Sequence, residues 1–351
     1  MRAVTFAEPG RVEIAEVPDP VPGPGEVLVQ VLAAGLCHTD IHIRRGLDRR
    51  AKPTMILGHE IAGIIAAASD GEARWSVGDR VVVYPLWACG RCAPCTAGQQ
   101  NACQGTGDRR RTPPTPGVSV NGGMADLVAV PADCLVEIGQ LAPSVAATMT
   151  DAALSPYASI NAVREHLTPG AWAVVIGVGG LGSMAVQILR ATSAAKIVAI
   201  DQSVEALANM RPWVDDARQA DEPGLSRKVL EQTGGYGARV VFDFVGADTT
   251  LALATDVVAP FGAIQVSGMI GGSVRLTADA TCRLPRGASI TPRMFGGTRA
   301  ELGDVLRLAK ATALVPNITE YPFEAAVQAF DDLEAGRIHG RAVLRLGVGP
   351  R

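Results

Sequence analysis

The sequence predicts an α/β protein that combines a β-rich domain with a doubly wound parallel-sheet domain. In the first 150 residues, short valine-rich runs such as 27–31 and 80–84 are punctuated by Pro and Gly, which is typical of β-strands. After about residue 153, apolar strands alternate with helical segments, as in a parallel sheet with helices on both faces. With 351 residues, 48% of them hydrophobic, the chain is long enough for two packed cores.

The order of the elements predicts that the parallel-sheet domain is inserted into the other one. The predicted parallel-sheet segments are the strand 173–177, a helix from about Gly180, and the strands 197–201, 239–245, 262–268 and 289–296. The tail carries helices within 300–315 and 323–336 and a strand at 341–346, and it resembles the first lobe. We therefore predict one domain from residues 1–152 and 297–351, and a second from residues 153–296.

Composition excludes several classes of function. The net charge is −3, and the one basic cluster, Arg109–Arg111, has no interleaved aromatic residues, which argues against nucleic acid binding. Acidic residues within the first 16 positions interrupt any signal peptide, and seven cysteines, four of them clustered, favour a reducing cytoplasm. The uncharged run 169–189 is long enough for a membrane span, but its five glycines indicate a buried strand, a turn and a helix.

Four cysteines, Cys89, Cys92, Cys95 and Cys103, follow the spacing C-x2-C-x2-C-x7-C in one short loop. This spacing is typical of a tetrahedral zinc site. Four thiolates close the coordination shell and leave no position for water, so such a site stabilises a fold and has no open position for chemistry. The loop therefore predicts a structural zinc ion.

A glycine-rich turn predicts a dinucleotide site. The run from Gly177 to Gly182 follows an apolar strand and opens a helix, so the turn presents backbone N–H groups to a pyrophosphate. Asp201 ends the next strand, where its carboxylate would bind the adenosine ribose and repel a 2′-phosphate, which favours NAD over NADP. The alternative is a glycine turn needed only for packing, with Asp201 a solvated strand end. The candidate cofactor residues are Gly177, Gly179, Gly180, Leu181, Gly182 and Asp201.

Together with the cysteine loop and the glycine-rich turn, three further motifs carry a resemblance to a known family. They are GLCHTDIH at 35–42, GHEIAG at 58–63 and GDRV at 78–81. In combination they resemble the zinc-dependent medium-chain alcohol dehydrogenases over essentially the whole chain. The resemblance implies a GroES-like catalytic domain, an inserted Rossmann domain that binds NAD, and two Zn²⁺ ions per chain, one catalytic and one structural.

The resemblance also implies a catalytic metal site. Cys37 and His59 match two ligands, and Glu60 matches a neighbouring carboxylate that approaches the metal as its coordination changes. Many members have a cysteine as the third ligand, whereas this chain has Asp151, which zinc accepts and which makes the site harder. Asp40 matches the carboxylate that orients His59, with capping of the following helix as the alternative.

Proton transfer and phosphate binding follow from the same resemblance. Thr39 would contact the alcohol and pass its proton through the cofactor ribose to His42, whose side chain titrates near neutrality. His38 matches a pyrophosphate contact, and Arg341 is another candidate, with a surface charge as the alternative. The segment Arg211–Trp213 departs from the regular helix that relatives have near the adenine pocket.

The substrate pocket is the least constrained prediction. Trp87 and Tyr157 are its candidates, with Leu86 and Met269 nearby, and Trp87 is as well suited to core packing. Few charges surround these positions, which favours a neutral primary or secondary alcohol and the matching aldehyde or ketone. Alternatives are a biosynthetic reductase or polyol dehydrogenase, and a non-catalytic zinc- and NAD-binding protein. The strand 289–296 would pair across a two-fold axis in a homodimer or homotetramer.

Overall fold

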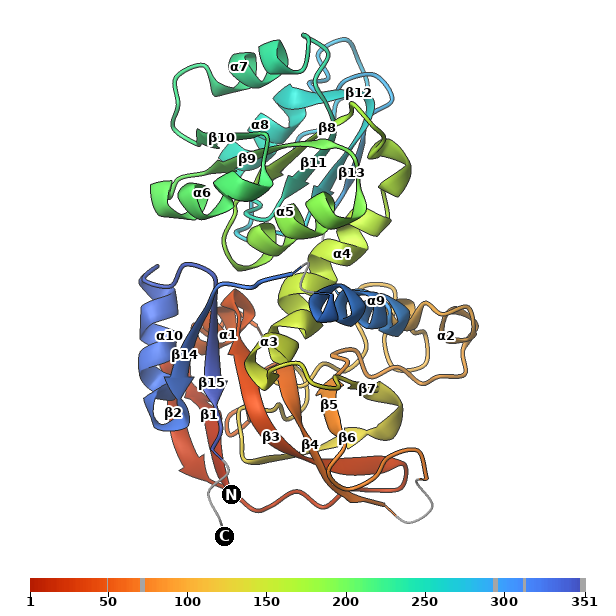
Figure 1. The fold of residues 1–351 in the computed structure, drawn as a ribbon, viewed down its shortest axis with the longest axis vertical. Helices are drawn as coiled ribbons and strands as arrows, with labels where there is room; N and C mark the ends of the chain where they lie inside the picture. Colours follow the sequence, from red (N-terminus) through yellow and green to blue (C-terminus); the bar gives the residue numbers. More distant parts are fainter. Residues whose placement is uncertain (49, 70–72, 293–295, 312–313, 348–351) are drawn as a thin grey trace. The chain divides into compact units, whose positions relative to one another are not determined.

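The chain forms two compact units, seen here in a computed structural model that describes residues 1–48, 50–69, 73–292, 296–311 and 314–347 (Figure 1). Unit 1 comprises Met1–Ala152, Gly296–Lys310 and Pro316–Arg351. Unit 2 comprises Ala153–Phe295 and Ala311–Val315. The chain thus leaves unit 1 after Ala152, returns at Gly296, and contributes one more short segment, Ala311–Val315, to unit 2.

Unit 1 is built on a seven-stranded sheet. Its strands are β3 (Glu26–Leu36), β4 (Glu60–Ala68), β5 (Arg80–Val83), β6 (Leu127–Pro131), β7 (Leu135–Glu137), β14 (Ile318–Pro322) and β15 (Arg341–Arg345). They run in the order β14-β15-β3-β4-β5-β7, and β6 pairs with β3. A separate two-stranded sheet joins β1 (Arg2–Glu8) and β2 (Arg11–Glu16). The strands predicted at 27–31, 80–84 and 341–346 are confirmed as β3, β5 and β15.

Alternating burial along β3 places its valines in the core of unit 1, because successive side chains of a strand point to opposite faces. The helices are α1 (His38–Arg44), α2 (Ala93–Thr96), α3 (Pro143–Thr148), α9 (Arg299–Lys310) and α10 (Ala326–Glu334), with 3₁₀ turns at Gln100–Ala102, Ala132–Cys134 and Phe323–Ala325. Helix α3 packs on β3 and β4, and α10 closes the core with a face of buried apolar side chains (Figure 1).

Unit 2 is a doubly wound sheet, as predicted. Its strands are β8 (Trp172–Ile176), β9 (Lys196–Asp201), β10 (Asp216–Gln219), β11 (Ala238–Asp243), β12 (Val258–Val266) and β13 (Ser289–Thr291). All neighbours pair in parallel, in the order β10-β9-β8-β11-β12-β13. The order reverses between β8 and β11, and this reversal creates the crevice at which such sheets bind ligands.

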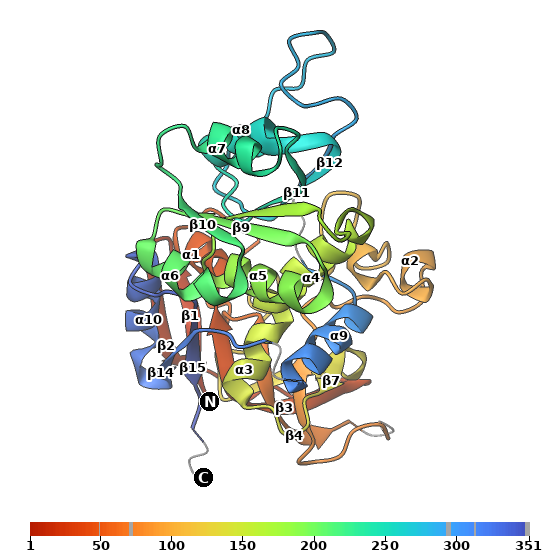
Figure 2. The same ribbon diagram turned by 45° about the horizontal axis from the view of Figure 1, so that its top comes forward.

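Helices cover both faces of this sheet. They are α4 (Leu154–Asn161), α5 (Gly180–Thr192), α6 (Val204–Met210), α7 (Leu225–Gln232) and α8 (Asp248–Val257), with 3₁₀ turns at Arg164–His166 and Arg211–Trp213. Figure 2 shows α5 and α6 on one side of the strands and α7 and α8 on the other. The contacts agree, since α5 and α6 pack on β8, β9 and β10 while α8 packs on β11 and β12.

The uncharged run 169–189 forms β8, the glycine-rich turn and most of α5, as predicted. Within the part of the chain that the structure describes, no helix is both long and apolar enough to cross a membrane. The strand predicted at 289–296 is shorter, since β13 ends at Thr291, and residues 293–295 lie outside the described residues. The helix predicted within 300–315 ends at Lys310, and residues 312–313 are likewise outside them.

The core of unit 1 yields a stability prediction. Phe330, on α10, is fully buried, so Phe330→Ala should lower the free energy of unfolding by about 3–5 kcal/mol through lost burial and the cavity left behind. Urea unfolding followed by circular dichroism measures this. Val327→Ala, on the same helix but 38% exposed, serves as the control and should change stability by less than about 0.5 kcal/mol. Equal effects of the two variants would contradict the assigned core.

Candidate functional site

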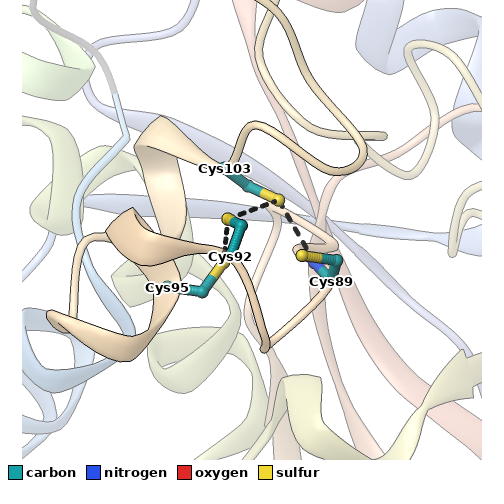
Figure 3. A group of neighbouring side chains, drawn as sticks. All are labelled: Cys89, Cys92, Cys95 and Cys103. Carbon is teal, nitrogen blue, oxygen red and sulfur yellow. Dashed lines mark hydrogen bonds between the residues drawn. The ribbon is translucent and has the colours of Figure 1, made fainter.

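The four cysteines of the loop converge on one point, with Cys92 and Cys95 at the start of α2 and within it (Figure 3). Their sulfur atoms all lie within 4.8 Å of one another, and those of Cys92 and Cys95 are 3.4 Å apart. None of the four forms a disulfide. Four free thiols around one centre form the donor set of a closed tetrahedral zinc site.

Hydrogen bonds to the sulfurs favour thiolates at this site. Although burial acts in the opposite direction, the Cys89 N–H and the Thr106 hydroxyl lower the pKa of Cys103 to about 5. The backbone N–H groups of Cys95 and Gln104 lower the pKa of Cys92. Burial, together with Cys92 and Cys103, raises the pKa of Cys95 to about 12. All four cysteines would therefore be thiolates only with a metal ion bound, because metal binding displaces the thiol proton.

A second cluster joins Cys37, His59 and Asp151, whose potential ligand atoms all lie within 4.8 Å of one another. Cys37 follows β3 and caps the start of α1, and His59 immediately precedes β4. Asp151 lies in a single π-helical turn, Met149–Ala153, between α3 and α4. Such π turns are frequent at functional sites, and here the turn brings a helix residue to the two strand ends. One sulfur, one imidazole and one carboxylate are a donor set that zinc accepts, with a fourth position open.

The charges of this cluster favour a cation. Burial opposes protonation of His59, yet Asp40, Asp151 and Cys37 together raise its pKa well above the usual range. The His59 Nε2 and Asp151 Oδ2 atoms are 3.8 Å apart. The His59 Nδ1 atom is buried without a hydrogen-bond partner among the described residues. The negative side chains therefore stabilise positive charge at the position that a metal ion would take.

Arg341 lies beside this cluster and is 4% exposed. Its Nη2 donates to Asp151 Oδ2 at 2.7 Å and also to Glu60 Oε1. Although burial opposes it, the negative charges of Glu60, Cys37 and Asp151 raise the pKa of Arg341 well above the usual range. The guanidinium thus sits among carboxylates and is no surface charge, which excludes that alternative; a phosphate contact remains a prediction.

Glu60 is fully buried beside the metal cluster. Burial and the neighbouring Asp151 raise the pKa of Glu60 to about 7, although Arg341 and His59 act in the opposite direction. Its second oxygen, Oε2, is buried with no hydrogen-bond partner among the residues described. Glu60 is therefore held near the site with one acceptor unused.

Asp40 serves two groups at once. Its Oδ2 accepts the Cys37 backbone N–H at 2.9 Å and so caps α1, while its Oδ1 lies 3.8 Å from His59 Nδ1. Asp40 thus caps α1 and also lies next to the His59 ring, so the structure contains a contact for each of its two predicted roles. The Thr39 hydroxyl lies 3.7 Å from Cys37 Sγ, next to the metal cluster.

His42 and His38 belong to the same short helix, α1. Burial, followed by the positive charge of Arg45, lowers the pKa of His42, so its imidazole is neutral over a wider pH range and available as a proton acceptor. His38 is exposed at the first position of the helix. Neither histidine is part of a metal-ligand cluster among the described residues.

The glycine-rich turn of unit 2 has the geometry that a dinucleotide requires. Gly177 has a φ of +81°, which other residues rarely adopt. A Cβ on Gly182 would overlap the carbonyl of Gly177, whereas one on Gly179 would meet open space, so the chain leaves room there for a ligand to approach. Gly180 and Leu181 begin α5, whose free N–H groups face that space.

Asp201 ends β9 beside this turn. Its Oδ2 accepts the Val178 N–H at 2.7 Å, and its Oδ1 accepts the Ser203 N–H at 2.8 Å. A carboxylate has about four acceptor sites, so each oxygen retains capacity for a ribose hydroxyl. Asp201 is therefore fixed against the glycine-rich turn, at the end of the strand where the sequence predicts a carboxylate that binds the adenosine ribose.

Sequence reasoning missed a second carboxylate of unit 2, Asp243, at the end of β11. It is fully buried and accepts from Val245 N at 2.8 Å, Gly246 N at 2.9 Å and Thr250 Oγ1 at 2.8 Å. These bonds fix the loop after β11, against which Gly177 packs so tightly that a Cβ there would lie 2.6 Å from Val245 Cγ2. The signal was present, since an acidic residue interrupts the apolar run of a predicted buried strand.

The predicted substrate-pocket residues divide between the units. In unit 1, Leu86 is buried, and Trp87 packs against the core and lines a surface pocket of about 650 Å³ with Ile56, Asn121 and Leu127. In unit 2, Tyr157 is buried on α4 and Met269 is 53% exposed. The surroundings of Trp87 support the core-packing alternative.

The segment Arg211–Trp213 forms a separate 3₁₀ turn after α6. Pro212 stands at its first turn, and the Trp213 carbonyl accepts a hydrogen bond from Arg190 Nε at 2.8 Å. The regular helix ends at Met210, and Pro212, which has no backbone N–H to donate, lies in the turn that follows.

Comparisons with known proteins assign the family. Residues 23–140 match the alcohol dehydrogenase GroES-like domain, and residues 180–311 match the zinc-binding dehydrogenase family. The chain is 31% identical to an NAD-dependent alcohol dehydrogenase of Sulfurisphaera tokodaii, over 98% of this chain and 99% of the relative. It is 32% identical to a D-arabinose 1-dehydrogenase (NADP(+)) of Saccharolobus solfataricus, over 97% and 95%.

The solved structures agree. The alcohol dehydrogenase from Aeropyrum pernix is similar with a TM-score of 0.90 and 26% identity, covering 99% of this chain and all of that one. The fold, the two family matches and the full-length relatives show that the chain belongs to the zinc-dependent medium-chain alcohol dehydrogenases. It is an oxidoreductase, and the predicted family and the predicted combination of GroES-like and Rossmann folds are confirmed.

The position of Asp201 yields a prediction for cofactor choice. Asp201→Ala removes the predicted acceptor for the ribose hydroxyls and the charge that would repel a 2′-phosphate. The affinity for NAD should therefore fall by roughly 10- to 100-fold, because a charge-assisted hydrogen bond contributes about 1.5–3 kcal/mol. NADP affinity should fall less or rise. Fluorescence titration with both reduced cofactors measures the ratio of affinities. Asp221→Ala, at an exposed position of unit 2, is the control; an unchanged ratio in Asp201→Ala would contradict the assignment.

Proposed function

We propose that this protein catalyses reversible hydride transfer between NAD and a neutral primary or secondary alcohol, with the aldehyde or ketone as substrate in reverse. The cluster of Cys37, His59 and Asp151 carries this proposal, because three protein ligands leave the fourth position of a zinc ion for the substrate. The glycine-rich turn with Asp201 supplies the matching cofactor site.

Two metal sites of different kinds support a content of two Zn²⁺ per chain. Cys89, Cys92, Cys95 and Cys103 would hold a structural ion, since four sulfurs leave no open position. Cys37, His59 and Asp151 would hold the catalytic ion. When bound, the zinc would supply Lewis acidity toward the substrate oxygen, and NAD would accept the hydride.

The residues around the cluster are suited to moving the proton. The Thr39 hydroxyl, beside Cys37, would accept a hydrogen bond from the alcohol and donate its own proton onward. His42, with its lowered pKa, would accept the proton near solvent. Asp40 would hold both the Cys37 backbone and the His59 ring in place.

Unit 1 would act as the catalytic domain and unit 2 as the NAD-binding domain, with the domains running from 1–152 and 297–351 and from 153–296. His38 and Arg341 remain our candidates for phosphate contacts from the catalytic domain. NAD is favoured over NADP because Asp201 places a negative charge at the adenosine end of the site. The relatives do not decide this, since they include both an NAD- and an NADP-dependent enzyme.

A polyol or sugar dehydrogenase is the second candidate function. The D-arabinose 1-dehydrogenase among the relatives supports it at an identity similar to that of the alcohol dehydrogenases. We favour a small neutral alcohol because few charged residues surround the predicted pocket positions in the sequence. Trp87 would then pack against the core of unit 1 and would not line the substrate pocket.

The assembly and location follow as part of the same proposal. Among the described residues, strand β13 is an edge of the six-stranded sheet, so two copies would pair there in a homodimer, or in a homotetramer built from two such dimers. The reduced cysteines of the zinc loop fit a cytoplasmic environment.

A spectrophotometric screen tests the proposed function. Alcohols, polyols and pentoses would be offered with NAD, and aldehydes and ketones with NADH, while absorbance at the nicotinamide band is followed. We expect turnover of a neutral alcohol that is lost after chelation and restored by Zn²⁺, because the substrate position belongs to the metal. Turnover that is insensitive both to chelation and to Asp151→Ala would contradict the proposal, and preference for a pentose would favour the second candidate.

A further inference from the structure

Three neighbouring strands of unit 1 bring Glu60, Gly35 and Arg341 close together. In the sheet order, β3 lies between β15 and β4. Gly35 on β3 is paired directly with Glu60 on β4, and on its other side with Val343 on β15. Arg341 begins β15 and donates to the carboxylate of Glu60, so its side chain reaches across β3.

This reach depends on the missing side chain at position 35. A Cβ on Gly35 would overlap Glu60 Oε2 and would lie 2.8 Å from both the Cβ and the Cδ of Glu60. The backbone of Gly35 does not have a positive φ, so its conformation is open to any residue. The sheet therefore needs glycine here for the space that the Glu60 carboxylate occupies, and not for the path of the chain.

The carboxylate held in this space stands outside the potential ligand set of Cys37, His59 and Asp151. Its Oε1 accepts from Arg341 Nη2, which also donates to the ligand Asp151 at 2.7 Å. Its Oε2 is fully buried and has no hydrogen-bond partner among the described residues. A buried anion with a free acceptor is costly; Arg341 stabilises its other oxygen, and an ion between Cys37, His59 and Asp151 would be a second cation close to it.

We propose that Gly35 is a positioning residue that keeps Glu60 withdrawn from the catalytic metal, and so keeps the fourth coordination position open. The space above Gly35 and the Arg341 guanidinium together hold the carboxylate in place. Any side chain at position 35 displaces the carboxylate toward the ion, where it closes the coordination shell. This inference rests on the proposed metal site at Cys37, His59 and Asp151.

Cobalt substitution at that site tests the proposal without relying on activity. Gly35→Ala adds one methyl group and no charge. We expect a changed Co²⁺ ligand-field spectrum and about tenfold slower release of Co²⁺ to a chelator, the lower end of the effects of groups next to metal ligands. Gly35→Ala combined with Glu60→Gln keeps the crowding but removes the anionic ligand, so its release rate should match that of Glu60→Gln alone.

Two further variants complete the test. Gly63→Ala crowds the same sheet, because its Cβ would overlap the Gln30 carbonyl oxygen and would lie 2.7 Å from Val29 Cγ1, and it should leave the spectrum and release rate unchanged. Arg341→Lys keeps the positive charge but loses the planar guanidinium fork, and it should also slow Co²⁺ release. This variant tests the proposal if Gly35→Ala does not fold.

The outcomes separate the two proposals. Two results would overturn the proposed role of Gly35 but leave the metal site standing. One is a folded Gly35→Ala variant with the wild-type release rate and spectrum. The other is slow release that persists when Gly35→Ala is combined with Glu60→Gln. A wild-type chain that takes up no Co²⁺ at Cys37, His59 and Asp151 overturns the proposed metal site, and this inference with it.

Discussion

The buried ionic cluster around Arg341 is the constraint on which the site of unit 1 depends. One guanidinium nitrogen, Nη2, donates to both Glu60 and Asp151, and all three groups lie beside Cys37 and His59. A buried charge that loses its partner costs about 3–5 kcal/mol, so each member of the cluster requires the others. The arginine thereby compensates two carboxylates of which only one, Asp151, belongs to the three-ligand set.

The fold assembles this cluster from distant parts of the chain. Strand order places β15, from the end of the sequence, beside β3 and β4, while the π turn at Met149–Ala153 brings Asp151 to the same place. The cysteine loop differs, because its four ligands come from 15 consecutive residues, Cys89 to Cys103, and need only a local fold. The proposed closed site thus depends on local structure, and the proposed open site depends on long-range contacts.

The same distinction decides how much the sequence could predict. The cysteine spacing and the glycine-rich turn depend on neighbours in sequence, and the strands around them are found where predicted. The contact of Arg341 with Asp151 spans 190 residues and depends on strand register, which spacing does not reveal. Resemblance supplied Arg341 as a phosphate contact. Its carboxylate partners emerged only from the structure, Glu60 from the order of β15, β3 and β4, and Asp151 from the π turn. Gly35 opens the motif GLCHTDIH, but the motif does not reveal its importance, which is the volume that Glu60 fills.

Metal content measures the central claim most directly, namely that one chain holds a closed and an open zinc site. Elemental analysis of the purified protein and of Asp151→Ala and Cys92→Ala would be combined with native mass spectrometry. The account predicts two zinc ions in the wild type and one in Asp151→Ala, which keeps the ion at Cys89, Cys92, Cys95 and Cys103. Two ions retained in Asp151→Ala, or a single ion in the wild type that is lost with Cys92 alone, would contradict it.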